Sequence, residues 1–276
     1  MLKSACMKKI IFCFLFFLGY FPVLFSQKQN NKSAETPSLP TAKETEASAR
    51  KLNIDSAITV KNTVVIEGQH VPYTVTAGSI PVWDENDKPV AGVFYTYYER
   101  SGVNDRSSRP LVISFNGGPG TPSVWMEIGY TGPRILKIDD EGYPVQPYGM
   151  KDNPYSILDV ADIVYVDPVN TGFSRPVSKD VPRTKFFGVN ADIKYLAQWI
   201  STFISRYKRW ASPKYLIGES YGTTRVSGLA LELQNAQWIY LNGVILVSPT
   251  GLGIERGGVM DAALLLPYYA ATAWYH

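Results

Sequence analysis

The stretch KYLIGESYGTTR, residues 214–225, decides how the rest of the chain is interpreted. It contains the pattern Gly-x-Ser-x-Gly at Gly218, Ser220 and Gly222, after an apolar run and before TTRVSGLALELQ, which has the spacing of a helix. In this pattern a strand turns sharply into a helix, and the two glycines let the backbone segments pass each other. We therefore expect Ser220 at the carboxyl end of a strand, either as a nucleophile or as a structural turn residue.

Short apolar runs on both sides of this stretch predict further strands. Four runs have the continuous apolar character of central strands buried on both faces. They are LVISF (111–115), DIVYVD (162–167), KYLIG (214–218) and GVILVSP (243–249). Together with the helices between them, they predict an α/β fold with a mostly parallel central sheet and right-handed crossovers.

A helix is expected at residues 190–207, between the second and third of these strands. Asn190 is the predicted N-cap, and Asp192 suits the first turn because of its negative charge. Apolar residues recur at the three-and-four spacing of one buried helix face. They are Ile193, Leu196, Ala197, Ile200, Phe203, Ile204 and Tyr207.

The segment from residue 58 to residue 100 has a different pattern. The runs ITVKNTVVI, VPYTVTAGSIPVW and AGVFYTYYER are rich in Val, Thr, Tyr and Ile, and DENDKP at 84–89 is suited to a hairpin turn. We expect these runs to add antiparallel strands to the amino-terminal side of the sheet.

The amino terminus predicts export. Residues 1–26 have three lysines, then an apolar stretch, then Ser26, which is the order of a secretory signal peptide. The alternative is a membrane anchor, but the apolar run of residues 10–25 is short for a span and contains Gly19 and Pro22. Residues 27–50 are polar and predict a flexible lead-in, so the domain proper is expected at 51–276. The mature protein should then be periplasmic or extracellular.

Charge and cysteine content exclude several classes of function. The net charge of +3 equals the three lysines Lys3, Lys8 and Lys9, so the mature chain is near neutral and gives no electrostatic reason to bind nucleic acid or an anionic membrane. Both cysteines, Cys6 and Cys13, precede residue 27. Without them the chain holds no disulfide, and its two distant histidines form no metal-ligand cluster, so no metal or cofactor is expected.

A second motif supports a catalytic role for Ser220. FNGGPG, residues 115–120, directly follows the strand predicted at 111–115. A nucleophilic serine needs amide donors for the oxyanion that it creates, and a glycine-rich loop after an early strand can supply them. The parallel topology should bring this loop and Ser220 to the same edge of the sheet.

Five motifs in order along the chain resemble those of the serine carboxypeptidase family, peptidase family S10, and its bacterial members in particular. They are NGGPG (116–120), GPR (132–134), DNPYS (152–156), VYVDPVNTGFS (164–174) and GESYG (218–222). The resemblance implies an α/β-hydrolase fold, and removal of carboxy-terminal residues from peptides, typically at acidic pH. Some relatives are acyltransferases that use the same serine.

The resemblance also implies a role for individual residues. Ser220 would be the nucleophile, and the backbone amides of Gly118 and Tyr221 would form the oxyanion hole. The substrate's free carboxylate would be bound by the residues of a second set. These are the Asn116 side chain, the Gly117 amide and the Glu219 side chain.

The Glu219 role carries a chemical condition. Glu219 must be protonated to donate a hydrogen bond to a carboxylate, so binding should weaken as the pH rises. The sequence departs from the best-known eukaryotic members at one position, because Tyr130 stands where they have a second glutamate. The Tyr130 hydroxyl can still donate or accept a hydrogen bond, but exopeptidase specificity rests on fewer acidic groups.

The general base is missing from the expected place. In α/β-hydrolases the acid and the histidine follow the serine, yet only His276 does so here, and the resemblance matches its segment to a region before the catalytic histidine. The other histidine, His70, lies in the predicted amino-terminal strands. We therefore expect a domain that is incomplete at its carboxyl end and nearly inactive by itself. An esterase or acyltransferase on the same scaffold, and a noncatalytic peptide-binding remnant, are the alternatives.

Overall fold

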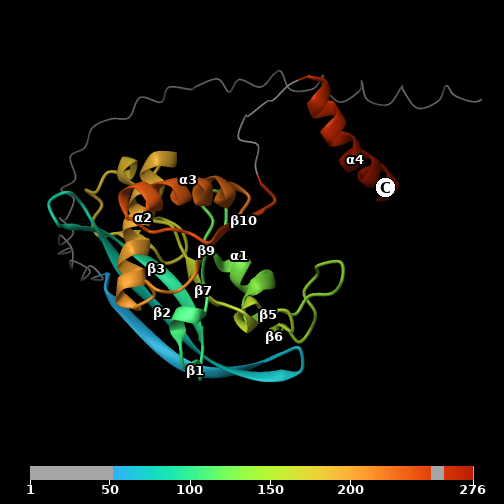
Figure 1. Ribbon diagram of the computed structural model, residues 1–276, viewed down its shortest axis with the longest axis horizontal. Coiled ribbons are helices and arrows are strands. Elements are labelled where there is room, and N and C mark those ends of the chain that lie inside the picture. The colour runs from blue at the N-terminus through green and yellow to red at the C-terminus, as the bar shows by residue number, and fades with distance from the viewer. Residues whose placement is uncertain (1–51, 250–257, 276) are drawn as a thin grey trace, which may run out of the picture. The chain divides into compact units, whose positions relative to one another are not determined.

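A computed structural model describes residues 52–249 and 258–275 of the 276-residue chain. The predicted signal peptide (1–26) and polar lead-in (27–50) lie outside these residues, as does His276. Figure 1 shows the arrangement of the helices and strands. None of the helices in the two described segments is long and apolar enough to cross a lipid bilayer.

The main sheet has the strand order β1-β2-β3-β7-β4-β9-β10, and the short β8 pairs with β3. Its strands are β1 (Ser56–Ile66), β2 (Gln69–Trp83), β3 (Pro89–Arg100), β4 (Leu111–Phe115), β7 (Asp162–Val166), β8 (Arg175–Pro176), β9 (Lys214–Glu219) and β10 (Gly243–Val247). A separate pair consists of β5 (Arg134–Leu136) and β6 (Met150–Asp152). The helices are α1 (Val124–Met126), α2 (Val189–Arg206), α3 (Tyr221–Ala236) and α4 (Val259–Tyr275).

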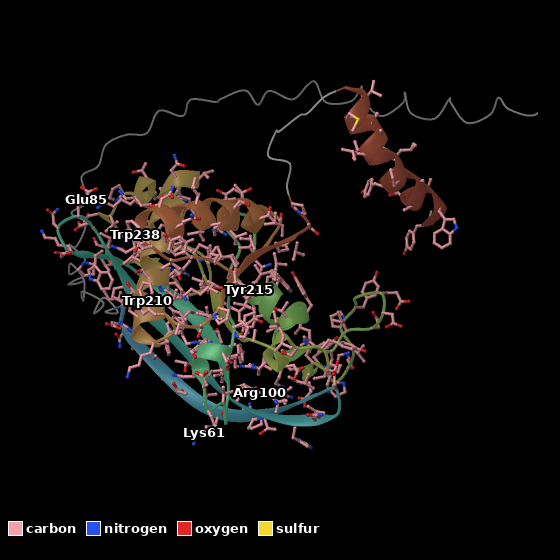
Figure 2. The ribbon with its side chains drawn as sticks, in the orientation of Figure 1. Lys61, Glu85, Arg100, Trp210, Tyr215 and Trp238 are labelled. Atoms are coloured by element: carbon pink, nitrogen blue, oxygen red, sulfur yellow. The ribbon has the colours of Figure 1, made fainter. Side chains whose placement is uncertain are left out.

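The predicted division of the sheet is confirmed. Strands β1, β2 and β3 form an antiparallel meander, and β7, β4, β9 and β10 run parallel to one another. The turn predicted at 84–89 connects β2 to β3, where the Asp84 amide donates to the Lys88 carbonyl at 2.9 Å. Residues 56–63 of β1 are exposed, and they include Lys61, which is labelled in Figure 2. A charged residue on an edge strand opposes pairing with other chains.

The central strands are buried on both faces because their side chains alternate between two apolar clusters. Leu111, Ile113 and Phe115 of β4 belong to the larger cluster, which includes the buried residues of α2 and α3. Val112 points to the other face, where it belongs to a cluster with Met126 and Ile217. The sheet therefore has helices α2 and α3 on one face and the segment that includes α1 on the other.

Strand β10 corrects one prediction. Its sequence GVILV predicts a central strand, but Val244, Ile245 and Leu246 are 38%, 41% and 47% exposed. Within residues 52–249 and 258–275, β10 pairs only with β9 and forms the edge of the sheet. An apolar run can show that a strand favours burial, but the neighbours that bury it come from elsewhere in the fold.

Helix α2 confirms the predicted buried face and corrects the predicted cap. The residue preceding the helix is Gly188, at φ 108°, and Asn190 lies inside the first turn. Phe203 fixes the carboxyl-terminal half of α2 to the sheet, since its ring stacks on Trp199 at 5.2 Å and meets the Tyr95 ring of β3 edge-on at 5.5 Å. This packing sets the position of α2, and with it the position of Asp192.

Candidate active site

Ser220 lies at a sharp turn between β9 and α3, as the sequence predicts. Its backbone has φ 55° and ψ −123°, which is a strained conformation for a residue with a side chain and costs about 1–3 kcal/mol. The Ser220 amide donates to the carbonyl of Val247, at the end of β10, at 3.0 Å. A side chain on Gly218 would overlap the Gly222 carbonyl, so glycine is required where strand and helix pass. Neighbouring structure thus holds Ser220 at the carboxyl edge of the sheet.

The segment Asn116–Gly120, which we call the glycine loop, lies directly beside this turn. Strand β4 pairs parallel with β9, with Phe115 opposite Gly218, so the two strands end together. A β-carbon on Gly117 would lie 2.6 Å from the Tyr221 nitrogen and 2.8 Å from the β-carbon of Ser220. The predicted proximity of the loop and the serine is therefore confirmed.

Asn116 and Glu219 meet at the base of this loop. The Asn116 side-chain nitrogen donates to Glu219 Oε2 at 3.1 Å. The other side of the same amide is occupied, because Asn116 Oδ1 accepts a bond from the Met126 backbone nitrogen at 2.8 Å. The Met126 bond thus orients the Asn116 NH₂ group toward Glu219.

An open cleft of about 680 Å³ lies over these groups. It is lined by Asn116, Gly117, Gly118, Thr121, Trp125, Tyr130, Glu219, Ser220, Val247 and Ser248. Five of the six residues singled out from the sequence thus line one cleft. The sixth, Tyr221, follows Ser220 and lies at the first position of α3. Sequence reasoning missed Thr121, Trp125, Val247 and Ser248, which lie outside the two glycine motifs.

Tyr130 lines the cleft and interacts electrostatically with Glu219. Burial raises the pKa of the Tyr130 hydroxyl, and the negative charge of Glu219 raises it further. The hydroxyl also contacts the Met126 sulfur. Tyr130 is therefore an uncharged neighbour of Glu219 in this cleft.

No histidine of the described segments lies among the residues that line this cleft. His70 is an exposed residue of β2, where it pairs with Val65 of β1. In the same segments no three His, Cys, Asp or Glu side chains come together in a way that could hold a metal ion. The groups that the cleft offers for chemistry are backbone amides, one amide side chain, one carboxyl and four hydroxyls, those of Ser220, Ser248, Thr121 and Tyr130.

A partly buried acid, Glu127, lies next to the cleft on the π-helical turn Glu127–Thr131. Tyr98 of β3 donates to Glu127 Oε1 at 2.7 Å. Burial raises the pKa of Glu127 to about 7; the Tyr98 bond opposes the shift and the charge of Asp167 adds to it. This turn follows Met126 and includes Tyr130, which lines the cleft, so the protonation state of Glu127 can affect the wall of the cleft.

Comparison with known proteins agrees with this geometry. The profile of the serine carboxypeptidase family (Peptidase_S10) matches residues 66–270, which include both glycine motifs. The chain belongs to the serine carboxypeptidase family. The matched region covers every residue that lines the cleft.

Curated relatives of this family were found in plants and in a slime mould. Serine carboxypeptidase-like 16 of Arabidopsis thaliana is 30% identical over 219 residues, which cover 76% of this chain and 48% of that protein. Serine carboxypeptidase S10 family member 1 of Dictyostelium discoideum is 28% identical over 176 residues, covering 63% and 38%. The chain thus spans less than half the length of these relatives.

A solved structure supports the same fold. The prohormone-processing carboxypeptidase from Saccharomyces cerevisiae matches with a TM-score of 0.52 and 23% identity, over 63% of this chain and 38% of that one. This chain therefore has the α/β-hydrolase fold predicted from its sequence.

The pKa of Glu127 predicts a specific pH dependence of stability. The folded state binds this proton more tightly than the unfolded state, whose value is near 4.5, so stability falls as the pH rises from 4.5 to about 7. This difference between the pKa of Glu127 in the folded and the unfolded state corresponds to about 3 kcal/mol of unfolding free energy. Urea unfolding of Glu127→Gln at pH 5 and pH 8 should show that this part of the pH dependence has gone. Glu141→Gln, at an exposed position, should keep it, and an unchanged pH dependence in Glu127→Gln would contradict the assignment.

Two glycines of the same loop provide a matched test of its packing. A β-carbon on Gly117 would press against Tyr221 and Ser220, whereas one on Gly120 meets nothing within 4 Å. Gly117→Ala should therefore displace the loop and lower the rate at which a fluorophosphonate labels Ser220 at least tenfold. Gly120→Ala should label like the unchanged chain. Equal rates for the two variants would show that the loop does not pack against the serine.

Proposed function

We propose that this chain carries the nucleophile and the substrate-binding groups of an exported serine carboxypeptidase, which removes carboxy-terminal residues from peptides through an acyl-enzyme on Ser220. The observation that supports this most strongly is the contact of Gly117 with Ser220 and Tyr221. It brings a strained serine and a loop of backbone amides together in one cleft. Family membership supports the same reaction class.

The chemical step follows from the surroundings of Ser220. Its hydroxyl oxygen attacks the carbonyl carbon of the last peptide bond, and the carbonyl oxygen becomes an oxyanion. When the oxyanion collapses, the C–N bond breaks and the carboxy-terminal residue leaves with the proton that the hydroxyl gave up, so that the rest of the peptide is an ester on Ser220. Water then hydrolyses that ester, which releases the shortened peptide and returns the proton to Ser220. The Gly118 and Tyr221 amides donate hydrogen bonds to that oxyanion, a type of stabilisation worth about 3–4 kcal/mol per donor. Tyr221 is the first residue of α3, so the positive end of the helix dipole also favours the developing charge.

Recognition of the peptide terminus uses the groups beside the serine. The Asn116 NH₂ group, the Gly117 amide and a protonated Glu219 would each donate to the substrate carboxylate. The hydrogen bond between Asn116 and Glu219 supports this arrangement, because it holds two of the donors side by side. An ionised Glu219 would repel the carboxylate, so binding is expected to favour acidic pH.

The proton of the Ser220 hydroxyl must pass to a base. In the described segments the candidate site contains no histidine, and His70 is an exposed strand residue. We propose that the 276 residues by themselves acylate slowly, with a residual rate of about 10³ over water supplied by the oxyanion donors and by binding. Export through a signal peptide at 1–26 is part of the same proposal.

The nucleophile is tested by covalent labelling. Ser220→Ala should abolish labelling of the chain by a fluorophosphonate during a long incubation, because the reagent forms its bond with the Ser220 hydroxyl and the oxyanion donors assist that reaction. Ser248→Ala is the matched control, since Ser248 lines the same cleft. Labelling is read by mass spectrometry. If Ser248→Ala loses the label and Ser220→Ala keeps it, Ser220 is not the nucleophile.

Carboxylate recognition is tested by binding rather than turnover. By calorimetry, a blocked dipeptide with a free carboxylate should bind more tightly than its amide, and binding should weaken as the pH rises from the acidic to the neutral range. Glu219→Gln should bind with little dependence on pH over that range, because a glutamine amide donates its hydrogen bond at either pH. Equal binding of acid and amide would favour an esterase or acyltransferase that does not read the terminus.

A further inference from the structure

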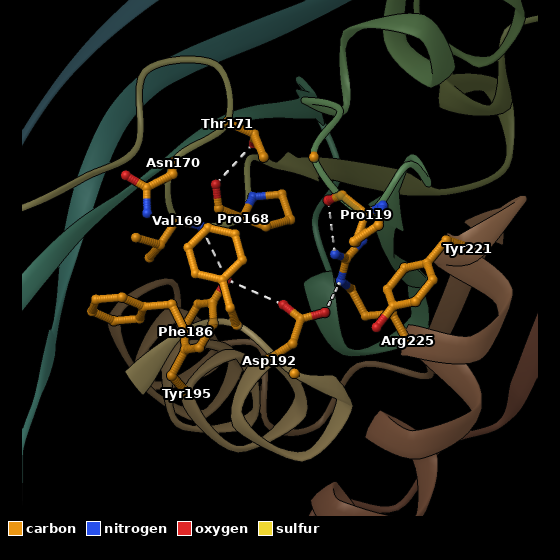
Figure 3. Close-up of a pocket in the computed structure, with 13 residues that line it drawn as sticks. Pro119, Pro168, Val169, Asn170, Thr171, Phe186, Asp192, Tyr195, Tyr221 and Arg225 are labelled. Carbon is orange, nitrogen blue, oxygen red and sulfur yellow. Dashed lines mark hydrogen bonds and ion pairs between the residues drawn. The ribbon is translucent and has the colours of Figure 1, made fainter. Parts of the chain in front are cut away.

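A buried ion pair lies directly behind the glycine loop. Arg225 of α3 donates from Nε to Asp192 Oδ2 of α2 at 2.7 Å, and the two residues are 1% and 6% exposed. Figure 3 shows both at a small cavity of about 40 Å³, together with Pro119 and Tyr221. Burying a charged pair has a desolvation cost, so its further contacts indicate what it does.

Arg225 also holds both ends of the glycine loop. Its Nη1 donates to the Asn116 carbonyl at 2.9 Å, and its Nη2 donates to the Pro119 carbonyl at 3.3 Å. These two carbonyls flank Gly117 and Gly118. One guanidinium therefore fixes the segment whose amides are proposed to contact the substrate.

The geometry of the peptide unit means that a hydrogen bond to a carbonyl also fixes the direction of the next amide. The Asn116 carbonyl and the Gly117 amide belong to one trans peptide unit, so they point in opposite directions. With the carbonyl on Arg225, the Gly117 amide points away from the guanidinium. In the same way, the Gly117 carbonyl accepts a bond from the Thr121 amide at 3.2 Å, which orients the Gly118 amide.

The guanidinium itself is fixed by its surroundings. Asp192 holds Nε, and the Tyr195 hydroxyl donates to the other oxygen of that carboxylate at 3.2 Å. The rings of Tyr221 and Phe115 lie 5.3 Å and 5.7 Å from the guanidinium carbon, within the range of a cation–π interaction. A lysine ammonium has no planar fork and cannot reproduce three bonds in these directions.

We propose that Arg225, held by Asp192, is a positioning residue that aims the amides of the glycine loop at the substrate. The inference rests on the proposed function of Ser220 and names a residue outside both glycine motifs that the reaction needs. A pair that only joined α2 to α3 would affect stability and leave the loop unchanged.

A second buried pair provides the matched control. Arg209 is 0% exposed, bonds Asp162 Oδ2 at 2.6 Å and donates to the Arg109 carbonyl at 2.8 Å. Asp162 is the first residue of β7, so this pair lies at the opposite end of the parallel strands. Arg209→Lys and Arg225→Lys thus make the same chemical change in similar surroundings, far from the loop and next to it.

The experiment uses the 276-residue chain and two readouts. Amide hydrogen exchange of residues 116–121 is followed by mass spectrometry, and fluorophosphonate labelling of Ser220 is followed over time. Arg225→Lys should raise the exchange rate of the loop and lower the labelling rate, each at least tenfold. Arg209→Lys should leave both within about twofold of the unchanged chain. If Arg225→Lys does not fold, as judged by circular dichroism, Asp192→Asn replaces it and should change both rates in the same directions.

Two results would overturn the inference. The first is a folded Arg225→Lys variant in which the exchange rate of the loop is unchanged. The second is a variant in which the loop exchanges faster but Ser220 is labelled at the same rate. Neither result would affect the proposed function. If the unchanged chain is not labelled at Ser220 at all, the proposed function fails instead. The exchange measurement then decides by itself whether Arg225 holds the loop.

Discussion

The parallel pairing of β4 with β9 is the constraint on which the site depends. Phe115 stands opposite Gly218, so the segments that follow the two strands leave the same edge of the sheet side by side. They can approach closely because Gly117 and Gly222 have no side chains. A shift of one residue in this register would separate the loop from Ser220 and turn the side chains of β4 to the other face.

Buried charges stabilise both ends of the parallel strands. Near the start of β4 and β7, Arg209 donates to the Arg109 carbonyl and its partner Asp162 accepts from the Arg100 amide. Behind the glycine loop, Arg225 is paired with Asp192 and donates to the Asn116 and Pro119 carbonyls. Replacing such pairs with apolar residues is often neutral for stability, so a role in fixing geometry is a reasonable cause of their presence. In this chain each pair bonds backbone carbonyls that irregular segments would otherwise leave buried and unsatisfied.

The sequence predicted the features that depend on local pattern. The turn at Ser220, the antiparallel meander and the buried face of α2 all follow from glycine spacing, β-branched residues or helical periodicity. Burial of β10 was predicted wrongly, because exposure depends on what packs beside a strand. The cap of α2 was also assigned wrongly, since Gly188 precedes the helix and Asn190 lies inside it. Arg225 bonds a residue 109 positions away in sequence, and its one local signal is a charge on the buried face of α3, three residues after Gly222.

The most direct test of the account is a proton distance between the two loops in solution. A β-carbon built on Gly117 would lie 2.6 Å from the Tyr221 nitrogen, so an α-proton of Gly117 must be close to the Tyr221 amide proton. In a chain selectively labelled at glycine and tyrosine, the account predicts a strong nuclear Overhauser effect between these two protons. Its absence, with both signals assigned and the protein folded, would place the glycine loop away from Ser220 and contradict the proposed active site.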